Sequence, residues 1–466
     1  MKTELKNLII GAGPAGYVCA IRLAQLSQEV TVVEKDAVGG ICLNRGCIPT
    51  KALLHYTHLI EQTKNLKAFG IDTSLSNFDW KKLLKHVASI TARLRKGIEY
   101  LLTKNNVKLI TGKAELTNSN HILVTSNNGT SEIIAERVII ATGSCCSCPS
   151  NVIPDKNIIL TSDEALVLEK IPKSLIIIGA GAIGLEFASI YNRIGTKTTI
   201  LELMPQILPG ADKEIAFLLT NYLKKQGINI ICNATIQKAS CLDNTVNVSV
   251  KTNEQELALT AEKILVASGR KANLDFLNLK NINIALDEKG YIKVNEKFQT
   301  NIENIYAIGD ITGPPLLAHK AMAQGISLAE LLAGIISAPR ITAIPLCIYT
   351  EPELAMVGLN EDEAANLNYD YIVAKVPLAA IGRAHTMNKL EGTAKIIVEK
   401  KSGIILGAQL LCPGASDLIN ELTLAINQKL PIESIIDTVH PHPTLGEIII
   451  EAAALIKKKA IHVINR

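Results

Sequence analysis

The sequence lacks several features that would assign it to a common class of protein. No apolar run reaches the roughly 18 residues that a membrane-spanning helix needs. Residues 1–6 are polar and do not resemble a secretory or transit peptide, so a cytoplasmic location is expected. No second close Cys/His pair completes a zinc pattern, and no metal site is predicted.

The sequence also lacks a large excess of charge of either sign. The 48 basic residues nearly balance the 44 acidic ones, which leaves a net charge of +4. The short basic run 457–459 is typical of a solvated helix face. Neither nucleic acid nor a membrane is therefore expected as a partner.

Length and composition indicate a large globular protein with several domains. A chain of 466 residues is too long for one hydrophobic core, and about three domains are expected. A hydrophobic content of 48% fits a well-buried chain. In a reducing compartment most of the ten cysteines are expected as thiols, with any disulfide serving catalysis.

A glycine-rich turn follows the first apolar strand. Residues 7–10 predict this strand, residues 17–26 a helix, and residues 30–33 a second strand that ends at Glu34. Between strand and helix lies a G-x-G-x-x-G motif at Gly11, Gly13 and Gly16. Such glycines allow close approach of a pyrophosphate to the helix N-terminus, and the acid binds ribose hydroxyls. The unit predicts a dinucleotide site.

The same pattern returns in the middle of the chain. A strand at 174–178 precedes Gly179, Gly181 and Gly184, and a strand at 198–202 ends at Glu202 with the same glycine-to-acid spacing. Two units predict two nucleotide cofactors, against the alternative of a repeat that binds nothing. A carboxylate at Glu202 accepts a hydrogen bond from a 2′-hydroxyl but repels a 2′-phosphate, which favours NAD over NADP.

Each unit is closed by an apolar strand that ends in glycine. Residues 137–144 and 263–270 form a matching pair of such strands, which we interpret as domain crossovers. A third strand, 304–308, ends at Gly309 and Asp310. The Asp310 carboxylate is placed to bind a polyol chain, to cap the helix expected over 316–333, or to do both.

After about residue 342 the pattern of expected strands and helices changes. Strands are expected at 344–349, 371–377 and 395–399, and helices at 417–428 and 432–437. Near the end, His442 precedes Glu447 by five residues across a proline-fixed turn, before a final helix to residue 457. Such a pair suits a general base oriented by a carboxylate, although a surface-loop histidine is the alternative. His440 has no carboxylate at that spacing and is expected only to support the site.

Cys42 and Cys47 stand beside several glycines and a proline. A disulfide between them would require a tight backbone, which Gly46 permits. Pro49 suits the first turn of a helix over 52–62, which puts Cys47 near a helix N-terminus where a thiolate is stabilised. These features suit thiol–disulfide exchange. The alternatives are two buried free thiols or half of a metal site.

Together these motifs resemble the pyridine nucleotide–disulfide oxidoreductase family, over essentially the whole chain. The resemblance rests on the cysteine segment 39–51, the two glycine motifs, Gly309-Asp310 and the segment 442–447. It implies an α/β fold with two Rossmann-like domains, for FAD and NAD, and a C-terminal α+β dimerisation domain. The expected boundaries are 1–145 with 270–341 for FAD, 146–269 for NAD, and 342–466 for the dimerisation domain.

The resemblance also implies roles for individual residues. Cys42 corresponds to the sulfur attacked by substrate, Cys47 to the flavin-proximal sulfur, and His442 to a base oriented by Glu447 and delivered by the partner subunit of a homodimer. Lys51 and Glu186 correspond to an ion pair near the flavin, and Asp310 to the ribityl-binding acid. The cofactor-binding set is Gly11, Gly13, Pro14, Ala15, Gly16, Glu34, Lys35, Gly40, Lys51, Gly143, Ser144, Gly309, Asp310, Gly179, Gly181, Ile183, Gly184, Glu186, Glu202, Gly269 and Arg270.

The implied reaction oxidises protein-bound dihydrolipoamide through a Cys42–Cys47 disulfide and FAD, and reduces NAD+. The implied partners are the lipoyl-bearing acyltransferases of 2-oxo acid dehydrogenase complexes, and the lipoyl carrier of glycine cleavage. An NAD(P)H-dependent thiol–disulfide reductase and a mainly structural subunit of a lipoyl complex are the alternatives.

Three features depart from the family pattern. Arg45 replaces a small apolar residue and is expected to face solvent, with a lowered thiolate pKa in the cysteine segment as the alternative. Gln324 replaces a common acid. Cys145, Cys146 and Cys148 cluster after the first crossover strand, where free thiols are expected, with adventitious metal binding as the alternative.

Overall fold

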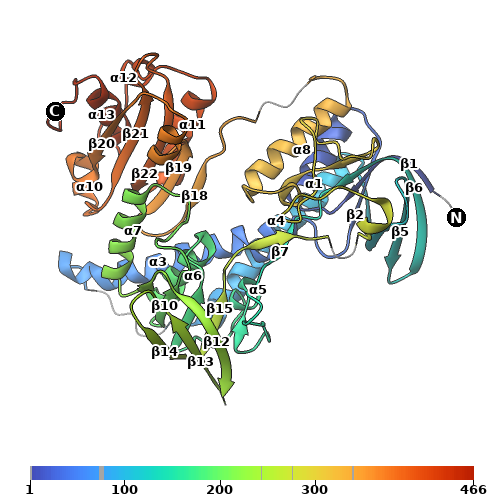
Figure 1. The fold of residues 1–466 in the computed structure, drawn as a ribbon, viewed down its shortest axis with the longest axis horizontal. Helices are drawn as coiled ribbons and strands as arrows, with labels where there is room; N and C mark the ends of the chain where they lie inside the picture. The colour runs from blue at the N-terminus through green and yellow to red at the C-terminus, as the bar shows by residue number, and fades with distance from the viewer. Residues whose placement is uncertain (1–2, 73–77, 243, 275–276, 338–340, 466) are drawn as a thin grey trace.

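The computed structural model describes residues 3–72, 78–242, 244–274, 277–337 and 341–465. Three bodies are visible in Figure 1: one that contains the N-terminus, one around β10 (Lys197–Leu201) and β15 (Lys263–Val266), and one that contains the C-terminus. Within the described part of the chain, no helix combines the length and apolar composition needed to cross a membrane.

The first body is built on a seven-stranded sheet. Its strands run in the order β3-β2-β1-β6-β5-β4, and β17 also pairs with β6. The core of the sheet is parallel, because β1 pairs in parallel with both β2 and β6, whereas β4, β5 and β6 form an antiparallel meander. The strands are β1 (Thr3–Ile10), β2 (Val30–Glu34), β3 (Lys108–Thr111), β4 (Lys113–Leu116), β5 (His121–Ser126), β6 (Gly129–Ile140) and β17 (Ile305–Ala307).

Helices from both ends of this unit pack on the sheet. Helix α1 (Pro14–Gln25) lies against α8 (Ala318–Leu332), as Figure 1 shows. They approach closely because a Cβ at Gly325 would lie 2.6 Å from the carbonyl oxygen of Ala15. The chain therefore returns to its first domain after the second nucleotide unit. The short helices η2 (Leu279–Ile282) and η3 (Gly309–Thr312) belong to this returning segment.

Three helices follow β2 before the sheet resumes. They are α2 (Gly40–Arg45), α3 (Cys47–Asn65) and α4 (Trp80–Lys104), with η1 (Leu66–Phe69) after α3. Helix α4 begins where Asp79 accepts a hydrogen bond from the backbone N–H of Lys82, as expected for an N-cap.

The second body has a five-stranded parallel sheet in the order β11-β10-β9-β15-β8. These strands are β8 (Ile159–Leu160), β9 (Ser174–Ile178), β10 (Lys197–Leu201), β11 (Asn229–Ile231) and β15 (Lys263–Val266). Its helices are α5 (Ser162–Ala165), α6 (Ala182–Arg193) and α7 (Lys213–Lys225). A three-stranded antiparallel sheet completes it, formed by β12 (Thr235–Leu242), β13 (Thr245–Lys251) and β14 (Glu256–Ala261).

Two antiparallel strands connect the first two bodies. β7 (Ser144–Cys146) pairs with β16 (Arg270–Ala272), with Ser144 opposite Ala272 and Cys146 opposite Arg270. One strand leads into the second body and the other leads out. They begin at Ser144 and Arg270, where the two predicted crossover strands end.

The third body is an α+β domain on a five-stranded antiparallel sheet, in the order β18-β19-β22-β21-β20. Its strands are β18 (Leu346–Ile348), β19 (Glu353–Gly358), β20 (Tyr371–Pro377), β21 (Thr393–Glu399) and β22 (Ile405–Cys412). Its helices are α9 (Glu361–Asn366), α10 (Gly382–Thr386), α11 (Ala415–Asn427), α12 (Glu433–Ile436) and α13 (Glu447–Ile456), with η4 (Leu378–Ala380). The predicted fold class, two Rossmann-like domains and a C-terminal α+β domain, is confirmed.

Some expected boundaries were wrong. Helix α1 begins at Pro14 rather than residue 17, because proline is well suited to the first helical position. Helix α3 begins at Cys47 and includes Ile48, because Pro49 lies within its first turn, where no intrahelical N–H bond is lost. The first strand extends back to Thr3 through residues that looked polar.

A buried lysine joins the second and third bodies. Lys395 on β21 is 2% exposed, and its ammonium lies 2.8 Å from Asp212 at the start of α7 and 3.4 Å from Glu214. Glu361 on α9 also contacts it. The Asp212 carboxylate is itself buried and accepts hydrogen bonds from the backbone N–H groups of Glu214 and Ile215.

Replacing Lys395 by methionine is therefore expected to destabilise the protein by about 3 kcal/mol, because Asp212 stays charged and buried without its cation. Denaturant unfolding at fixed protein and FAD concentration measures this change. Lys81→Met is the matched control, since its pair with Glu169 is largely exposed, and stability is expected to stay unchanged. Equal effects for the two variants would contradict the prediction.

Candidate active site

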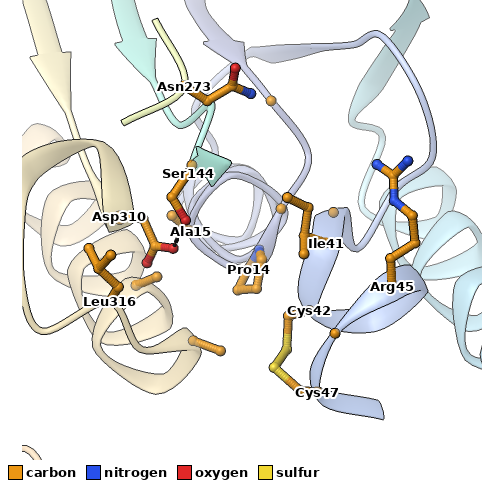
Figure 2. Close-up of a pocket in the computed structure, with 18 of the residues that line it drawn as sticks. Pro14, Ala15, Ile41, Cys42, Arg45, Cys47, Ser144, Asn273, Asp310 and Leu316 are labelled. Atoms are coloured by element: carbon orange, nitrogen blue, oxygen red, sulfur yellow. Dashed lines mark hydrogen bonds between the residues drawn. A yellow bond between two sulfur atoms is a disulfide. The ribbon is translucent and has the colours of Figure 1, made fainter. Parts of the chain in front are cut away.

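A cavity of about 490 Å³ lies where the first two bodies meet. Figure 2 shows part of its wall, with the Cys42–Cys47 disulfide on one side and Ser144 with Asp310 on another. The predicted site residues that line it are Gly11, Gly13, Pro14, Ala15, Glu34, Lys35, Gly40, Cys42, Cys47, Lys51, Gly143, Ser144, Ile183, Glu186, Arg270, Gly309 and Asp310. Residues of α6 share this wall with residues of α1, so both predicted nucleotide units reach one cavity.

The two cysteines of the predicted redox segment form a disulfide. Their Cα atoms are 4.6 Å apart, within the range that a disulfide requires. Helix α2 ends at Arg45 and α3 begins at Cys47, so the chain turns at Gly46 between two helices. A Cβ at Gly46 would lie 3.0 Å from the carbonyl oxygen of Ile41, which explains the glycine. The alternative of two free thiols is wrong for this pair.

Cys47 occupies the first position of a 19-residue helix. The backbone N–H groups of a first helical turn lack intrahelical partners, and the helix dipole places partial positive charge there. When the disulfide is reduced, this position at the start of a long helix stabilises a thiolate at Cys47.

The two glycine turns have the same geometry. Gly11 and Gly179 both have φ +103°, and a Cβ on either would lie 2.5 Å from a carbonyl oxygen of the following crossover strand, at Ala141 or Ala267. A Cβ at Gly16 would lie 1.9 Å from the carbonyl oxygen of Gly11. The equivalent distance from Gly184 to Gly179 is 2.0 Å. Both helices thus begin directly against their strands, with Gly13 and Gly181 as the N-cap residues.

The two predicted ribose-binding acids brace these turns. Glu34 accepts hydrogen bonds from the backbone N–H of Ala12, at 2.6 Å, and of Asp36, at 2.9 Å. Glu202 accepts from the N–H groups of Ala180, at 2.7 Å, and Met204, at 2.8 Å. Each carboxylate therefore fixes the turn and stands at the end of the second strand of its unit.

Gly16→Ala is expected to prevent stable FAD retention, and Gly184→Ala to prevent NAD binding while FAD is kept. In both variants the new methyl group collides with a backbone carbonyl that cannot move without opening the turn. The flavin absorbance of purified protein and NADH titration measure the two effects. Gly97→Ala on α4 is the control, because a Cβ there meets nothing within 4 Å. If Gly184→Ala lost FAD while Gly16→Ala kept it, the assignment of the first turn to FAD and the second to NAD would be contradicted.

Lys51 and Glu186 form an ion pair across the cavity. The Lys51 ammonium lies 2.9 and 2.8 Å from the two carboxylate oxygens of Glu186, and 4.6 Å from the ring centre of Tyr349. Glu186 also accepts a hydrogen bond from the backbone N–H of Tyr349. The pair joins the redox helix α3 to α6 of the second unit, and presents a cation beside the disulfide.

Asp310 belongs to a hydrogen-bonded chain on the opposite wall. Ser144 Oγ donates to Asp310 Oδ2 at 2.6 Å, drawn as a dashed line in Figure 2, and Arg270 Nε donates to Ser144 Oγ at 2.8 Å. Asp310 lies in η3, whereas α8 is capped by Leu317 without a side-chain bond. The helix-capping alternative for Asp310 is therefore wrong, and Asp310 lines the cavity.

Two contacts that support this wall were not predicted from the sequence, which singled out Gln324 only as a departure from the family pattern. Gln324 Oε1 accepts a hydrogen bond from the backbone N–H of Gly309 at 2.8 Å, so the amide oxygen performs the task that a carboxylate could perform there. Lys320 donates to the carbonyl oxygen of Gly313 at 2.5 Å. Burial lowers the pKa of Lys320, and Asp310 opposes this shift. Neither contact has a sequence signal, because the partners are neighbours only after folding.

Arg45 was expected to face solvent, and this was only half correct. Its side chain is 47% exposed, yet its guanidinium lies 2.8 Å from Asp36 and 3.5 Å from Asp163 on α5. Figure 2 shows the guanidinium directed away from the disulfide. The cation therefore links three segments of the cavity rim instead of acting directly on the sulfurs.

His442 and Glu447 form the expected pair. His442 Nδ1 lies 2.8 Å from Glu447 Oε1, and the second oxygen accepts from the backbone N–H of Thr444. Burial raises the pKa of Glu447, but the bonds from His442 and Thr444 outweigh it and lower that pKa. His442 is 77% exposed and is not among the residues that line the cavity of its own chain.

His440 has no carboxylate at the spacing of His442 and Glu447, as the sequence indicated, but it has a distant one. Its Nε2 lies 3.1 Å from Glu421 on α11, and its side chain is 8% exposed. The partner is 19 residues away in the sequence, so local spacing did not reveal it. His440 therefore anchors the loop that carries His442.

The residues around the cavity fit FAD. The glycine turn and the N-terminus of α1 would hold a pyrophosphate, Glu34 lies at the ribose end, and Asp310 would bind ribityl hydroxyls. A Cβ at Gly40 would lie 2.7 Å from Gly13, so only glycine leaves this cradle open. The matching turn at Gly179, Gly181 and Gly184, with Glu202, fits NAD. Gly269 stands on the crossover beside this second turn, where its carbonyl accepts from Ser147 N–H.

Comparisons with known proteins agree with this geometry. The chain is 42% identical to dihydrolipoyl dehydrogenase from Geobacillus stearothermophilus, over 99% of this chain and 98% of that protein. It is 39% identical to dihydrolipoyl dehydrogenase from Chlamydia pneumoniae, over 99% of each. The structure of LpdA from Mycobacterium tuberculosis superposes with a TM-score of 0.89 at 26% identity, and covers 96% of this chain and 99% of that one.

A second structural relative is HOCl-induced flavoprotein disulfide reductase RclA from Escherichia coli, with a TM-score of 0.85 at 31% identity, over 97% of this chain and 99% of that one. Residues 5–325 match the pyridine nucleotide-disulphide oxidoreductase family, and residues 344–453 match its dimerisation domain, which supports the predicted homodimer. The predicted enzyme class and the cofactors FAD and NAD are confirmed. The chain belongs to the pyridine nucleotide-disulphide oxidoreductase family.

Proposed function

We propose that this protein oxidises protein-bound dihydrolipoyl groups with NAD+, as the shared dehydrogenase subunit of 2-oxo acid dehydrogenase complexes. One observation carries the proposal: the Cys42–Cys47 disulfide, at the start of α3, lies on the wall of a cavity that is also lined by the first glycine turn and by helix α6 of the second unit. Full-length relatives at about 40% identity are named dihydrolipoyl dehydrogenase, which supports the same substrate.

The chain's own residues divide the chemistry between two sulfurs. Cys42 is attacked by the first substrate thiolate, which forms a mixed disulfide and releases Cys47 as a thiolate. The second substrate thiol then displaces Cys42, and the lipoyl disulfide leaves. Cys47 is the better leaving group because its helix N-terminus stabilises the thiolate. FAD bound in the cavity supplies electron-pair transfer between the sulfurs and the nicotinamide.

Proton transfer falls to the partner subunit's His442. In its own chain this imidazole is exposed and stands away from the cavity lining, which suits a group that completes a neighbouring site. Glu447 holds its Nδ1, so that Nε2 is free to accept the substrate thiol proton. The active unit is therefore the homodimer.

Glu202 sets the preference for NAD over NADP. Its carboxylate is 6% exposed and stands directly at the second glycine turn, where a 2′-phosphate would meet its negative charge. The partners that supply substrate are lipoyl-bearing acyltransferases and the lipoyl carrier of glycine cleavage. The cytoplasmic location stays a prediction.

Anaerobic titration of the purified protein with dihydrolipoamide, followed by NAD+ or NADP+, tests this function. A long-wavelength absorbance band is expected after two-electron reduction, from the Cys47 thiolate beside the flavin, and NAD+ alone should discharge it. A protein without flavin, or equal discharge by NADP+, would contradict the proposal. Reduction by NADPH but not by dihydrolipoamide would instead favour the thiol–disulfide reductase alternative.

A further inference from the structure

A second pair of sulfurs lies close together on the crossover between the two nucleotide domains. Cys146 Sγ and Cys148 Sγ are 3.7 Å apart, and both side chains are half-buried. Neither residue lines the cavity that contains Cys42 and Cys47, whereas Cys145, one position earlier, does. The proposed reaction gives Cys146 and Cys148 no role.

The backbone brings these two sulfurs together. Cys146 ends β7, and the peptide of Ser147 is held on both sides: its N–H donates to Gly269 O at 3.0 Å, and its carbonyl accepts from Ser268 Oγ at 2.9 Å. In an extended chain, residues two apart point to the same side, which sends Cys146 and Cys148 one way and Cys145 the other. The pair is therefore fixed before any reaction.

We propose that Cys146 and Cys148 form a second, reversible disulfide by exchange with a low-molecular-weight disulfide such as glutathione disulfide. The observation that carries this proposal is the 3.7 Å separation of two half-buried sulfurs on a braced backbone. Closing the bond needs the sulfurs to approach by less than 2 Å, to about 2.05 Å. The pair is a modification site, distinct from the catalytic disulfide.

The exchange has two balanced steps. The Cys148 thiolate attacks glutathione disulfide, which forms a mixed disulfide at Cys148 and releases one glutathione thiolate. Cys146 then passes its proton to a thiolate and attacks Cys148 Sγ, which forms the Cys146–Cys148 bond and releases the second glutathione. Two cysteine thiols lose two electrons, and one glutathione disulfide becomes two glutathione thiols.

The environment of the two sulfurs indicates this order. Burial raises the pKa of Cys146 to about 12, and the neighbouring Cys148 adds to the shift. Its S–H also lies 3.8 Å from the carbonyl oxygen of Val266. Cys146 is therefore the sulfur that stays protonated until a mixed disulfide stands beside it, where proximity compensates for its weak ionisation.

The bond would act on the NAD site through the crossover. Val266 ends β15, and the next residue, Ala267, carries the carbonyl against which Gly179 packs in the second glycine turn. Cys146 is paired with Arg270 across the two connecting strands. Drawing Cys148 toward Cys146 shifts this junction, so the KM for NAD+ is expected to rise about fivefold, within the usual range of coupling between sites.

The experiment treats FAD-loaded dimer with excess glutathione disulfide, then alkylates the remaining thiols and digests with trypsin. The peptide after Arg137 contains all three cysteines of the cluster. We expect it to carry one alkyl group, at Cys145, and to be two hydrogens lighter than the same peptide with one alkyl group and two free thiols. Dithiothreitol should restore three alkyl groups.

Matched variants assign the bond. Cys146→Ser and Cys148→Ser should each abolish the mass loss and the change in KM for NAD+, whereas Cys241→Ser, at an exposed thiol on β12, should leave both unchanged. Three alkyl groups after treatment, a persistent glutathione adduct at Cys148, or a ring that forms in Cys146→Ser would each overturn the proposal. The mass result does not depend on dihydrolipoamide turnover, so it stands or fails separately from the proposed function.

Discussion

Cys42→Ser should reduce dihydrolipoamide-dependent NAD+ reduction by about 10³-fold or more, as when an enzyme loses its nucleophilic centre. The hydroxyl cannot form a disulfide with Cys47, so no bond remains for the substrate thiolate to break. Steady-state rates at saturating dihydrolipoamide and NAD+ measure the loss. Assembly with lipoyl-bearing partners should not depend on Cys42. A loss of turnover with normal assembly would therefore show that the subunit is catalytic and not mainly structural.

The variant should keep its other properties, and these serve as internal controls. FAD content should equal that of the unaltered protein, because Cys42 contributes only part of a wall that the first glycine turn dominates. Electron transfer from NADH to ferricyanide should also continue, since it needs the flavin and the NAD site but not the disulfide. Cys42→Ser leaves Cys47 free at the helix N-terminus, so a long-wavelength band is expected in Cys42→Ser and not in Cys47→Ser. Full turnover in Cys42→Ser would refute the exchange mechanism.

Local signals explain why much of the fold and site could be predicted from the sequence. The two glycine motifs constrain five or six consecutive residues, and the structure gives Gly11 and Gly179 the same φ value. Cys47 at a helix start follows from Gly46 and Pro49, which act on adjacent backbone. In each case the cause lies within one turn of chain, where the sequence reports it directly.

Contacts between distant segments could not be predicted in this way. Gln324 reaches Gly309, Glu421 reaches His440, and Arg45 reaches Asp163 only because separate elements pack together. The sequence did not indicate the three carboxylates that contact Lys395, because two of them come from the start of α7 in another domain and the third from α9, which is distant in the sequence. Spacing along the chain carries no information about such partners.

The position of Arg270 was predicted from the sequence, but its side-chain contact was not. Its position after a strand-to-glycine end predicted a crossover, and β16 does pair with β7. The sequence could not show that its guanidinium would donate to Ser144, and so support Asp310 on the flavin side of the molecule. A residue near the second unit thus serves the wall of the first, because the two crossover strands run side by side.

His442→Ala is expected to lower kcat by about 10²- to 10⁴-fold, the usual contribution of a general base. Because the side chain is 77% exposed, its removal should cost little folding stability, so FAD content and unfolding should stay unchanged. Glu447→Gln should lower kcat less than His442→Ala, because the imidazole remains and only the carboxylate that orients it is lost. Stopped-flow reduction by dihydrolipoamide measures the step directly. Unchanged reduction in His442→Ala would exclude this base.

Hybrid dimers test where that base acts. Neither Cys42→Ser nor His442→Ala is active alone, but a dimer with one subunit of each would combine an intact disulfide from one with an intact imidazole from the other. Equal mixing after reversible dissociation should therefore restore about a quarter of the sites, since half of the dimers are hybrids and each has one complete site. If His442 served its own chain, every site would carry one defect and no activity would return. Recovery in the mixture thus requires that the cavity on one subunit be completed by the loop between α12 and α13 of the other.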